Sequence, residues 1–436
     1  MSPTVKASLW FVACNIIQKG ISFFTMPIFT SLMPEVEYGL FSVFQSWHSI
    51  IVIFATLNLH YQVYNNGAIK FEKRTNEYVT AIIGLAWSAC FVVFAFLFAL
   101  QRVWEPITKM PLHWMLYMAL ECAMTMPYSI FLCKERMRNH YKMVVVLTLI
   151  MFVSSTSLGL YMVRTHDGSA DSRVLSSTIV NTVIGLSVFI FLFRQSHKLY
   201  DKEIWTYALG LALPLIPHYL STVVLTSSDR IMIGLMCGND KVAIYTVANS
   251  LGMLMQFVVS SVNAAVNPWI YRTMNSKNYK ALRYRTKHLF VIMASATILP
   301  TIVGHFYIRL FMKPVYYEAT NLIGIIAAGA FFTYMYTIFL ILELFFEKTK
   351  YTSIASIIAA IANVVLNYIG IKLLGYKAAA YTTLICYMIM AVAHYCFLKK
   401  ISDQNNVSIK ELVDTKFVIL IGVVVCTFSI ILSVLI

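Results

Sequence analysis

Long apolar segments separated by short polar ones occupy the whole chain. A helix needs about 20 mostly apolar residues to cross the hydrocarbon core of a membrane. Because backbone polar groups find no water in lipid, we expect each such segment to be a helix. The thirteen segments that qualify cover approximately 8–33, 38–60, 78–100, 111–133, 141–163, 173–193, 204–236, 241–270, 286–311, 319–345, 351–373, 377–398 and 415–436. The pattern predicts an all-α polytopic membrane protein.

Composition supports this class and excludes others. Apolar residues make up 59% of the 436 residues and charged residues 12%, whereas soluble chains average about a quarter charged residues. A soluble enzyme, a disordered protein and a secreted disulfide scaffold are therefore excluded. The eight cysteines form no C-x-x-C pair, so metal and redox motifs are absent. We expect neither a metal site nor a cofactor.

The net charge of +15 is mostly an orientation signal. Lysines and arginines concentrate in alternate loops, and the side that they mark as cytoplasmic includes the N-terminus. These basic loops are short and separated, so we do not expect a nucleic-acid partner. The loops on the other side are too small for an independent domain, which argues against an enzyme such as a membrane glycosyl polymerase.

A weak internal repeat divides the chain into two six-helix copies, offset by about 203 residues. In each copy a long helix is followed by a tight turn and a helix that restarts on a small residue. We expect an N-terminal lobe at 1–200 and a C-terminal lobe at 201–400, related as parallel repeats. Residues 401–436 would form a cytoplasmic linker and an additional transmembrane helix.

Polar side chains form stripes along several predicted spans. Asn15, Gln18 and Lys19 share one helix face, and His218 occupies the corresponding place in the second copy. Further polar positions are Asn249, Gln256 and Asn263 in span eight, and Asn363 and Asn367 in span eleven. Such stripes cannot face lipid without loss of stability, so they either bond one another or line a wet cavity.

A few charges lie inside the spans. Lys19 lies near the predicted midplane, where an unpaired lysine costs about 2.5 kcal/mol or more. Structural pairing, for example with Glu121, is one interpretation; a cavity-lining cation is the interpretation we favour, because Lys19 belongs to the repeated stripe. Glu343 is either a buried charge or reaches the interface. Asp229 and Arg230 are either functional groups or an interfacial hinge pair.

Three prolines interrupt the leading helix of each half: Pro27, Pro214 and Pro217. Proline removes a backbone hydrogen bond and bends a helix. The bends are either static kinks or hinges used for gating.

Together these residues resemble the Wzx-type polysaccharide flippases, which share a superfamily with MATE exporters and the lipid flippase MurJ. The resemblance covers roughly 1–400. It rests on Asn15 and the run Lys19–Thr30, Glu37–Gly39, Thr56–Leu59, Leu213–His218, Asp229–Gly234 and Ala243–Ala248. Members commonly have twelve or fourteen helices, so the thirteenth span departs from the pattern.

The resemblance implies two six-helix lobes around a central cationic cavity in the bacterial cytoplasmic membrane. It also implies movement of undecaprenyl-diphosphate-linked oligosaccharide (an O-antigen, capsule or exopolysaccharide unit) from the inner to the outer leaflet. Polysaccharide polymerase or export machinery would be further partners. Lys19 and, less directly, Arg230 would balance the diphosphate. The polar residues Asn15, Gln18, His218, Asn249, Gln256, Asn263 and Asn367 would bind sugar or water.

The chain has no nucleotide-binding motif of the G-x-x-x-x-G-K-[ST] kind. An ion gradient or the membrane potential would then supply the energy, with Glu121, Asp229 or Glu343 as ion-coupling candidates. A MATE-like cation or drug exporter remains an alternative, in which acidic residues would dominate the cavity and Lys19 would be paired. A membrane glycosyl polymerase is a third.

Overall fold

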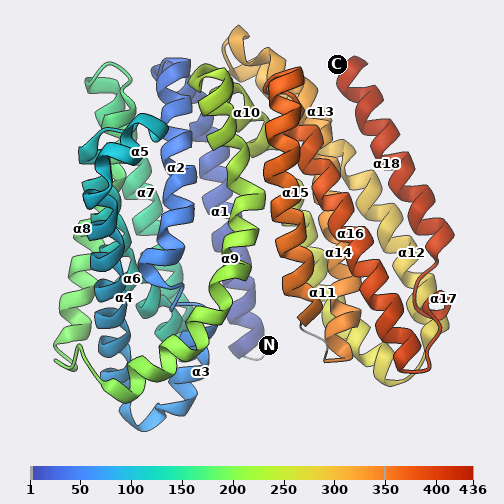
Figure 1. The fold of residues 1–436 in the computed structure, drawn as a ribbon, viewed down its shortest axis with the longest axis horizontal. Coiled ribbons are helices and arrows are strands. Elements are labelled where there is room, and N and C mark those ends of the chain that lie inside the picture. The colour runs from blue at the N-terminus through green and yellow to red at the C-terminus, as the bar shows by residue number, and fades with distance from the viewer. Residues whose placement is uncertain (1–2, 348–349, 436) are drawn as a thin grey trace. The chain divides into compact units, whose positions relative to one another are not determined.

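The computed structural model describes residues 3–347 and 350–435, and within them it contains helices and no strands (Figure 1). Twelve of its helical segments are long and apolar enough to cross a membrane. They coincide with twelve of the thirteen predicted spans. The first predicted span, 8–33, is a continuous 30-residue helix, Pro3–Leu32. The all-α polytopic prediction is confirmed.

The chain forms two compact units, Met1–Leu220 and Ser221–Ile436, each with its own core. Their boundary lies inside one long helix, α9 (Lys202–Cys237). The predicted lobe limits, 1–200, 201–400 and 401–436, remain a prediction.

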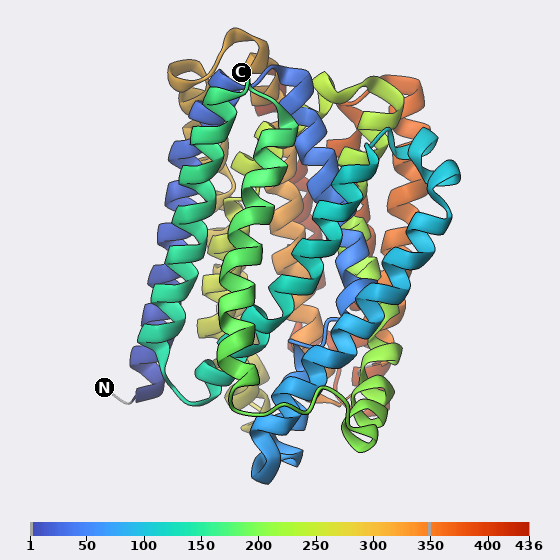
Figure 2. The same ribbon diagram turned by 90° about the vertical axis from the view of Figure 1, so that its left-hand side faces the viewer.

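Unit 1 is a bundle whose helices run from one end of the unit to the other (Figure 2). The α6–α8 and α7–α8 pairs make its most extensive contacts, and α1 packs mainly on α7. Its elements are α1 (Pro3–Leu32), α2 (Glu35–Thr56), α3 (Gln62–Lys70), η1 (Glu72–Arg74), α4 (Thr75–Ala99), α5 (Gln101–Thr108), α6 (Leu112–Met137), α7 (Tyr141–Thr165), α8 (Ala170–Phe193) and the first part of α9.

Unit 2 is built around α14, the most buried of the candidate spans, which packs closely against α16. Its elements are the rest of α9, α10 (Asn239–Gly252), α11 (Met255–Asn275), α12 (Tyr279–Ala296), α13 (Ile298–Phe311), η2 (Pro314–Ala319), α14 (Thr320–Phe345), α15 (Lys350–Leu374), α16 (Ala378–Gln404), α17 (Ile409–Leu412) and α18 (Thr415–Leu435).

Two predicted spans are divided in the structure. Span eight consists of α10 and α11, with a break at Met253 and Leu254, so Asn249 lies on a different helix from Gln256 and Asn263. Span nine is divided into α12 and α13 next to Pro300, which lies in the first turn of α13, where a proline is tolerated. By contrast, Pro27 lies within the continuous α1, and Pro214 and Pro217 lie within α9.

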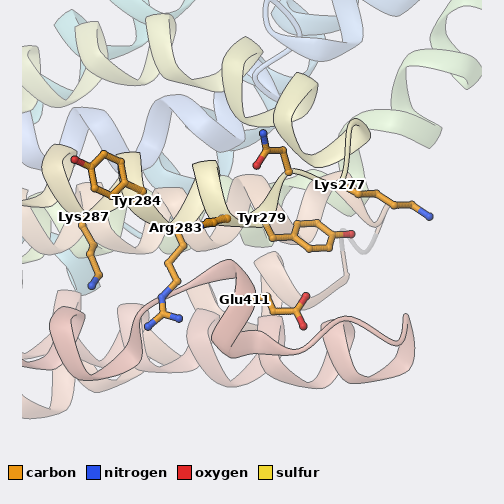
Figure 3. A pocket seen from close by; sticks show the side chains of 8 residues that line it. Lys277, Tyr279, Arg283, Tyr284, Lys287 and Glu411 are labelled. Carbon is orange, nitrogen blue, oxygen red and sulfur yellow. The ribbon is translucent and has the colours of Figure 1, made fainter.

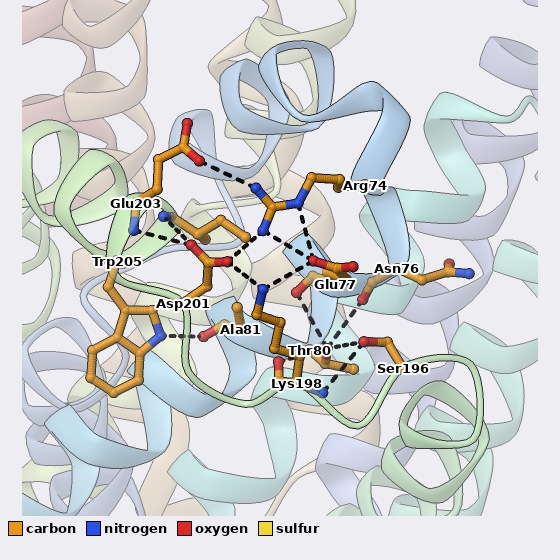
Figure 4. Close-up of polar contacts among 11 residues, drawn as sticks. Arg74, Asn76, Glu77, Thr80, Ala81, Ser196, Lys198, Asp201, Glu203 and Trp205 are labelled. Atoms are coloured by element: carbon orange, nitrogen blue, oxygen red, sulfur yellow. Dashed lines mark hydrogen bonds and ion pairs between the residues drawn. The ribbon is translucent and has the colours of Figure 1, made fainter.

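A charge cluster fixes one end of unit 1 by joining the start of α4 to the segment before α9 (Figure 4). Arg74 binds Glu77 (Nε–Oε2 3.0 Å) and also Asp201. Lys198 reaches Asp201 at 2.8 Å and Glu77 at 3.3 Å. Lys198, together with the backbone N–H of Ile204, lowers the pKa of Asp201 well below its usual range.

Close backbone packing accompanies this cluster. Thr80 donates a hydrogen bond to the Lys198 carbonyl (3.0 Å), and the Trp205 indole donates to the Ala81 carbonyl (2.9 Å). A methyl group on Gly84 would lie only 2.0 Å from the Leu199 carbonyl oxygen. Glycine is therefore required where α4 passes this segment.

Candidate functional site

Unit 2 contains a buried carboxylate surrounded by neutral donors. Asp229 on α9 is 4% exposed. It accepts hydrogen bonds from the Tyr245 hydroxyl of α10 (2.5 Å) and from Asn367 Nδ2 of α15 (2.6 Å). Thr383 Oγ1 of α16 lies 3.1 Å from Asp229 Oδ1 and 3.0 Å from Oδ2. Four helices thus converge on one acidic side chain.

A second layer of polar groups orients these donors. Asn363, one turn before Asn367, accepts a hydrogen bond from Ser228 (2.7 Å) and donates one to Thr383 (3.1 Å). Asn367 also donates to Asn363 Oδ1 (3.2 Å), and the Thr382 hydroxyl donates to the side-chain oxygen Oδ1 of Asn367. Asn363 and Asn367 are both fully buried. Because each buried amide is bonded, the donors around Asp229 are fixed in place.

The space beside Asp229 is very small. A cavity of about 10 Å³ is lined by Asp229, Tyr245, Asn249 and Thr383 together with apolar residues, and this volume corresponds to about one water molecule. A carboxylate with several hydroxyl and amide oxygens nearby can hold a proton or a small cation that has lost most of its water. The cavity leaves no room for a sugar.

Unit 1 contains a comparable carboxylate, Glu121 on α6, which is 4% exposed. Its Oε1 accepts hydrogen bonds from Ser177 (2.6 Å) and Thr178 (3.1 Å) of α8. Its Oε2 lies 3.6 Å from His48 Nε2 of α2. Glu121 is thus held by two hydroxyls and a titratable partner.

The third predicted coupling residue, Glu343 on α14, is fully buried. Its Oε1 lies 3.0 Å from Nδ1 of His394 on α16, which is also fully buried, and the Tyr336 ring stacks on the His394 ring. Among the described residues, Glu343 Oε2 and His394 Nε2 have no hydrogen-bond partner. Sequence reasoning named Glu343 but missed His394, which lies in a span with little polar pattern.

The predicted substrate residues are divided between the two units. Asn249 and Asn367 belong to the Asp229 region. Gln256 donates to Thr333 (3.3 Å), and Asn263 has a buried side-chain oxygen without a partner among the described residues. Asn15 and Lys19 are exposed on α1, and Gln18 is half-buried beside them. His218 and Arg230 are half-buried on α9, where Arg230 follows Asp229.

Sequence reasoning missed a polar pocket in unit 1. Its volume is about 700 Å³, and it lies between the α2–α3 connection, α3, the end of α6 and Tyr219. Its amide and aromatic lining consists of His60, Tyr61, Gln62, Asn65, Asn66 and Tyr219, with Arg136 as its cation. The rings of Tyr61 and Tyr219 stack at 5.8 Å. The signal in the sequence is the group of amides Gln62, Asn65 and Asn66, which lies between the predicted spans 38–60 and 78–100.

The fold defines an all-helical, multi-pass membrane protein. The solved structure of the lipid II flippase MurJ in an inward closed conformation aligns with a TM-score of 0.70, at 15% identity, over 98% of each chain. An inward-facing multidrug MATE transporter aligns with a TM-score of 0.60, at 14% identity, over 88% of this chain and 99% of that one.

Sequence comparison gives the family. The model described as "Polysaccharide biosynthesis protein" matches residues 4–274, and the MatE model matches 214–369. The Lsg locus putative protein 1 of Haemophilus influenzae is 21% identical over 289 residues, covering 62% of this chain and 67% of that protein. An uncharacterized membrane protein of Methanocaldococcus jannaschii is 21% identical over 96% of this chain and 88% of its own. The chain belongs to the polysaccharide biosynthesis protein family, because that model matches more than half of its residues.

Proposed function

We propose that this protein moves a polyprenyl-diphosphate-linked oligosaccharide from the inner to the outer leaflet of a bacterial cytoplasmic membrane by alternating access. The match of residues 4–274 to the polysaccharide biosynthesis family carries the proposal. The similarity in fold to a lipid II flippase supports it. In this proposal the N-terminus is cytoplasmic, and the oligosaccharide is an O-antigen, capsule or exopolysaccharide unit.

The headgroup needs a cation for its diphosphate and hydrogen-bonding groups for its sugars. We assign the first role to Lys19 on the 30-residue helix α1, with Arg230 on the candidate membrane span Lys202–Cys237 as a secondary cation. Asn15 and Gln18 on α1 would hydrogen-bond the sugar. Sugar or water would also be hydrogen-bonded by the other polar positions: His218, Asn249, Gln256, Asn263 and Asn367.

The pocket of unit 1 adds a place where sugars can bind. Amide side chains both donate and accept hydrogen bonds, and Gln62, Asn65 and Asn66 are all exposed along it. The stacked Tyr61 and Tyr219 rings supply an apolar face beside a polar edge. This combination suits a carbohydrate better than a compact organic cation.

Energy would come from the membrane potential or a coupled ion. Moving one charge through 100 mV is worth about 2.3 kcal/mol, so export of a headgroup with about two negative charges would gain roughly 4–5 kcal/mol. We propose Asp229 as the first ion-coupling candidate, because its bonded shell can respond to protonation or to a small cation. Glu121 and Glu343 are further candidates. Pro27, Pro214 and Pro217 are proposed hinges.

A MATE-like exporter of organic cations is the second candidate function. The MatE match over 214–369 favours it. In that case the buried carboxylates Asp229, Glu121 and Glu343 would bind the cation or a coupled proton, and Lys19 would not contact the substrate.

Flipping assays in proteoliposomes test the proposal directly. Fluorescent polyprenyl-diphosphate sugar and a fluorescent organic cation would be offered to the wild type, Lys19→Ala and Lys19→Arg. Lys142→Ala, an exposed lysine on α7, is the matched control. We expect lipid flipping by the wild type and the control, at least a tenfold loss in Lys19→Ala, and partial recovery in Lys19→Arg. Full activity of both Lys19 variants would remove Lys19 from the site; transport of the cation without flipping would favour the exporter.

A further inference from the structure

A basic pocket lies at the turn between α11 and α12 in unit 2 (Figure 3). Its volume is about 520 Å³, within the range of small-ligand pockets. It is lined by Lys277, Asn278, Tyr279, Lys280, Arg283, Tyr284, Lys287 and Glu411. The pocket therefore involves only the α11–α12 turn, the first part of α12 and the short helix α17.

The backbone of the α11–α12 turn positions Lys277. Lys277 has a positive φ of 54°, and its N–H donates to the Met274 carbonyl (3.0 Å). The N–H of Asn278 donates to the Thr273 carbonyl (3.1 Å), and its side chain caps α12 by accepting from the Ala281 N–H (3.1 Å). The chain thus reverses tightly, which brings Lys277 to the start of α12.

The remaining cations share one face of α12. Lys280, Arg283 and Lys287 are three, four and seven residues apart, which places them on the same side of a helix. Figure 3 shows Arg283 and Lys287 extending toward the same side of α12, and Arg283 toward the segment that carries Glu411. Positive charge is therefore concentrated on the face of α12 that lines the pocket.

The nearby carboxylates do not neutralise this charge. Asp414 binds both Arg283 (2.7 Å) and Lys287 (2.5 Å), and these two cations lower the pKa of Asp414 well below its usual range. Lys277 and Lys280 are exposed, and their side chains have no hydrogen bond or ion pair within the described residues. The four cations outnumber Glu411 and Asp414 by two.

Membrane topology alone does not require this arrangement. Basic residues orient a membrane protein wherever they lie in short loops, whereas here they converge on one cavity. A concave cluster of like charge raises the local concentration of counter-ions. The concentration of unpaired lysines around a cavity points to an anionic ligand.

We propose that this pocket binds the phosphate headgroup of an anionic membrane lipid that carries about two negative charges. The membrane-crossing segment Tyr279–Phe311 begins at the pocket, which places the cations at the level of lipid phosphates. Tyr279 and Tyr284 flank them, and Tyr284 is 66% exposed; tyrosine is enriched at this level of the bilayer. Basic pockets at helix ends are a known means of binding such headgroups.

A lipid titration on the purified full chain tests the proposal. The protein in a neutral detergent would be titrated with cardiolipin, with phosphatidylcholine as the uncharged comparison and inorganic diphosphate as the soluble one. The thermal unfolding midpoint reports binding, because a ligand of the folded state raises it. We expect cardiolipin to raise the midpoint at concentrations where phosphatidylcholine and inorganic diphosphate do not.

Charge-matched variants then locate the site. Each lysine near a membrane surface contributes about 1 kcal/mol to anionic lipid binding, so Lys277→Gln/Lys280→Gln should lose about 30-fold in apparent affinity. Lys142→Gln/Lys202→Gln removes two exposed lysines from unit 1 and should remain within about twofold of the wild type. Lys277→Arg/Lys280→Arg should retain binding.

Two results would overturn the proposal. Equal cardiolipin affinity in the Lys277→Gln/Lys280→Gln variant and its unit 1 control would show that the pocket does not bind the lipid. Binding of inorganic diphosphate as tight as that of cardiolipin would identify a free phosphate compound as the ligand.

Discussion

Each unit buries one carboxylate at the meeting point of several helices, but the two are held differently. Asp229 in unit 2 is surrounded by a tyrosine, an asparagine and a threonine from three other helices. Glu121 in unit 1 is bonded to two adjacent hydroxyls of α8 and lies near His48. One carboxylate joins four helices through neutral donors, whereas the other joins three and has a titratable neighbour.

This difference separates two kinds of buried acid. Neutral donors stabilise a carboxylate without cancelling its charge. The ionised form of Asp229 can therefore attract a proton or a small cation. The second oxygen of Glu121 lies beside the imidazole of His48 and accepts no hydroxyl or amide hydrogen bond from the described residues. We therefore expect the larger losses of stability and function from substitutions at Asp229.

The largest effect is expected at Asp229. Asp229→Leu leaves the donors of Tyr245, Asn367 and Thr383 buried without an acceptor, which costs about 1–3 kcal/mol for each unsatisfied group. Denaturant unfolding in detergent should show a loss of several kcal/mol or failure to fold. Asp229→Asn retains the shape and should fold, but we expect at least a tenfold loss of flipping in proteoliposomes.

The matched control for Asp229 is Asp240→Asn, which removes a charge from the exposed start of α10. It should leave both stability and flipping near wild-type levels. Wild-type flipping by Asp229→Asn would remove Asp229 from the coupling role and leave it a structural residue.

A smaller effect is expected at Glu121. Glu121→Leu removes the acceptor of the Ser177 and Thr178 hydroxyls, but each can donate to the Val174 carbonyl instead (2.9 and 3.0 Å), so the loss should be about 1–2 kcal/mol. Glu121→Gln retains the shape and an acceptor for these hydroxyls, so it should lose less flipping activity than Asp229→Asn in the same proteoliposome assay. A loss of stability larger than that of Asp229→Leu would reverse the comparison.

Packing of unit 1 is tested by Gly84→Ala. Its methyl group would meet the Leu199 carbonyl oxygen at 2.0 Å, and overpacking of this kind costs about 1–3 kcal/mol. Gly210→Ala is the matched control, because the new methyl group would meet nothing within 4 Å and alanine favours a helix. We expect a lower unfolding midpoint for Gly84→Ala than for the wild type and for Gly210→Ala. Equal midpoints would mean that the backbone at Leu199 can move away from α4 at little cost in stability.

The smallest effect is expected at the charge cluster of unit 1. Since Lys198 lowers the pKa of Asp201 below its usual value, the ionised form stabilises the fold above about pH 4, and this stabilisation is lost as the pH falls toward the lowered pKa. Unfolding midpoints measured from pH 7 to pH 3 should fall less steeply in Asp201→Asn than in the wild type. Because Lys198 and Arg74 are partly exposed, the difference should be below about 1 kcal/mol.

The Asp201 result can be checked with a double-mutant cycle. Lys198→Gln in the Asp201→Asn background should add little, because the two residues act as one pair. Full additivity would place the stabilising partner of Asp201 elsewhere, with Arg74 as the next choice.

Much of the molecule could be predicted from the sequence because membrane spans are encoded locally. The length and apolarity of each segment determine whether it crosses lipid, so all thirteen predicted spans are helical in the described residues. Asp229 and Asn367 could be selected individually because polar residues are rare in such segments. The breaks at Met253–Leu254 and at Thr297 were not predicted, since the apolar pattern continues through them.

The partners of the selected residues were not predictable in the same way. Tyr245 and Thr383 approach Asp229 from positions 16 and 154 residues away, and His394 approaches Glu343 across 51 residues. Hydroxyl and aromatic residues are common in apolar helices, so their presence in a span does not reveal which neighbour they face. The basic residues 277–287 were predicted as an orientation signal, and only the position of α17 beside α12 makes them a pocket.

The sequence by itself determined the class of protein, its helical spans and its family resemblance, because all three depend on the order of residues along the chain. The tertiary structure decided which polar residues act together: the shell of Asp229, the hydroxyls at Glu121, the amide pocket of unit 1 and the basic pocket of unit 2. The physical reason is that burial and hydrogen bonding are properties of helix faces in contact, and the rotation of each helix about its axis is set by packing.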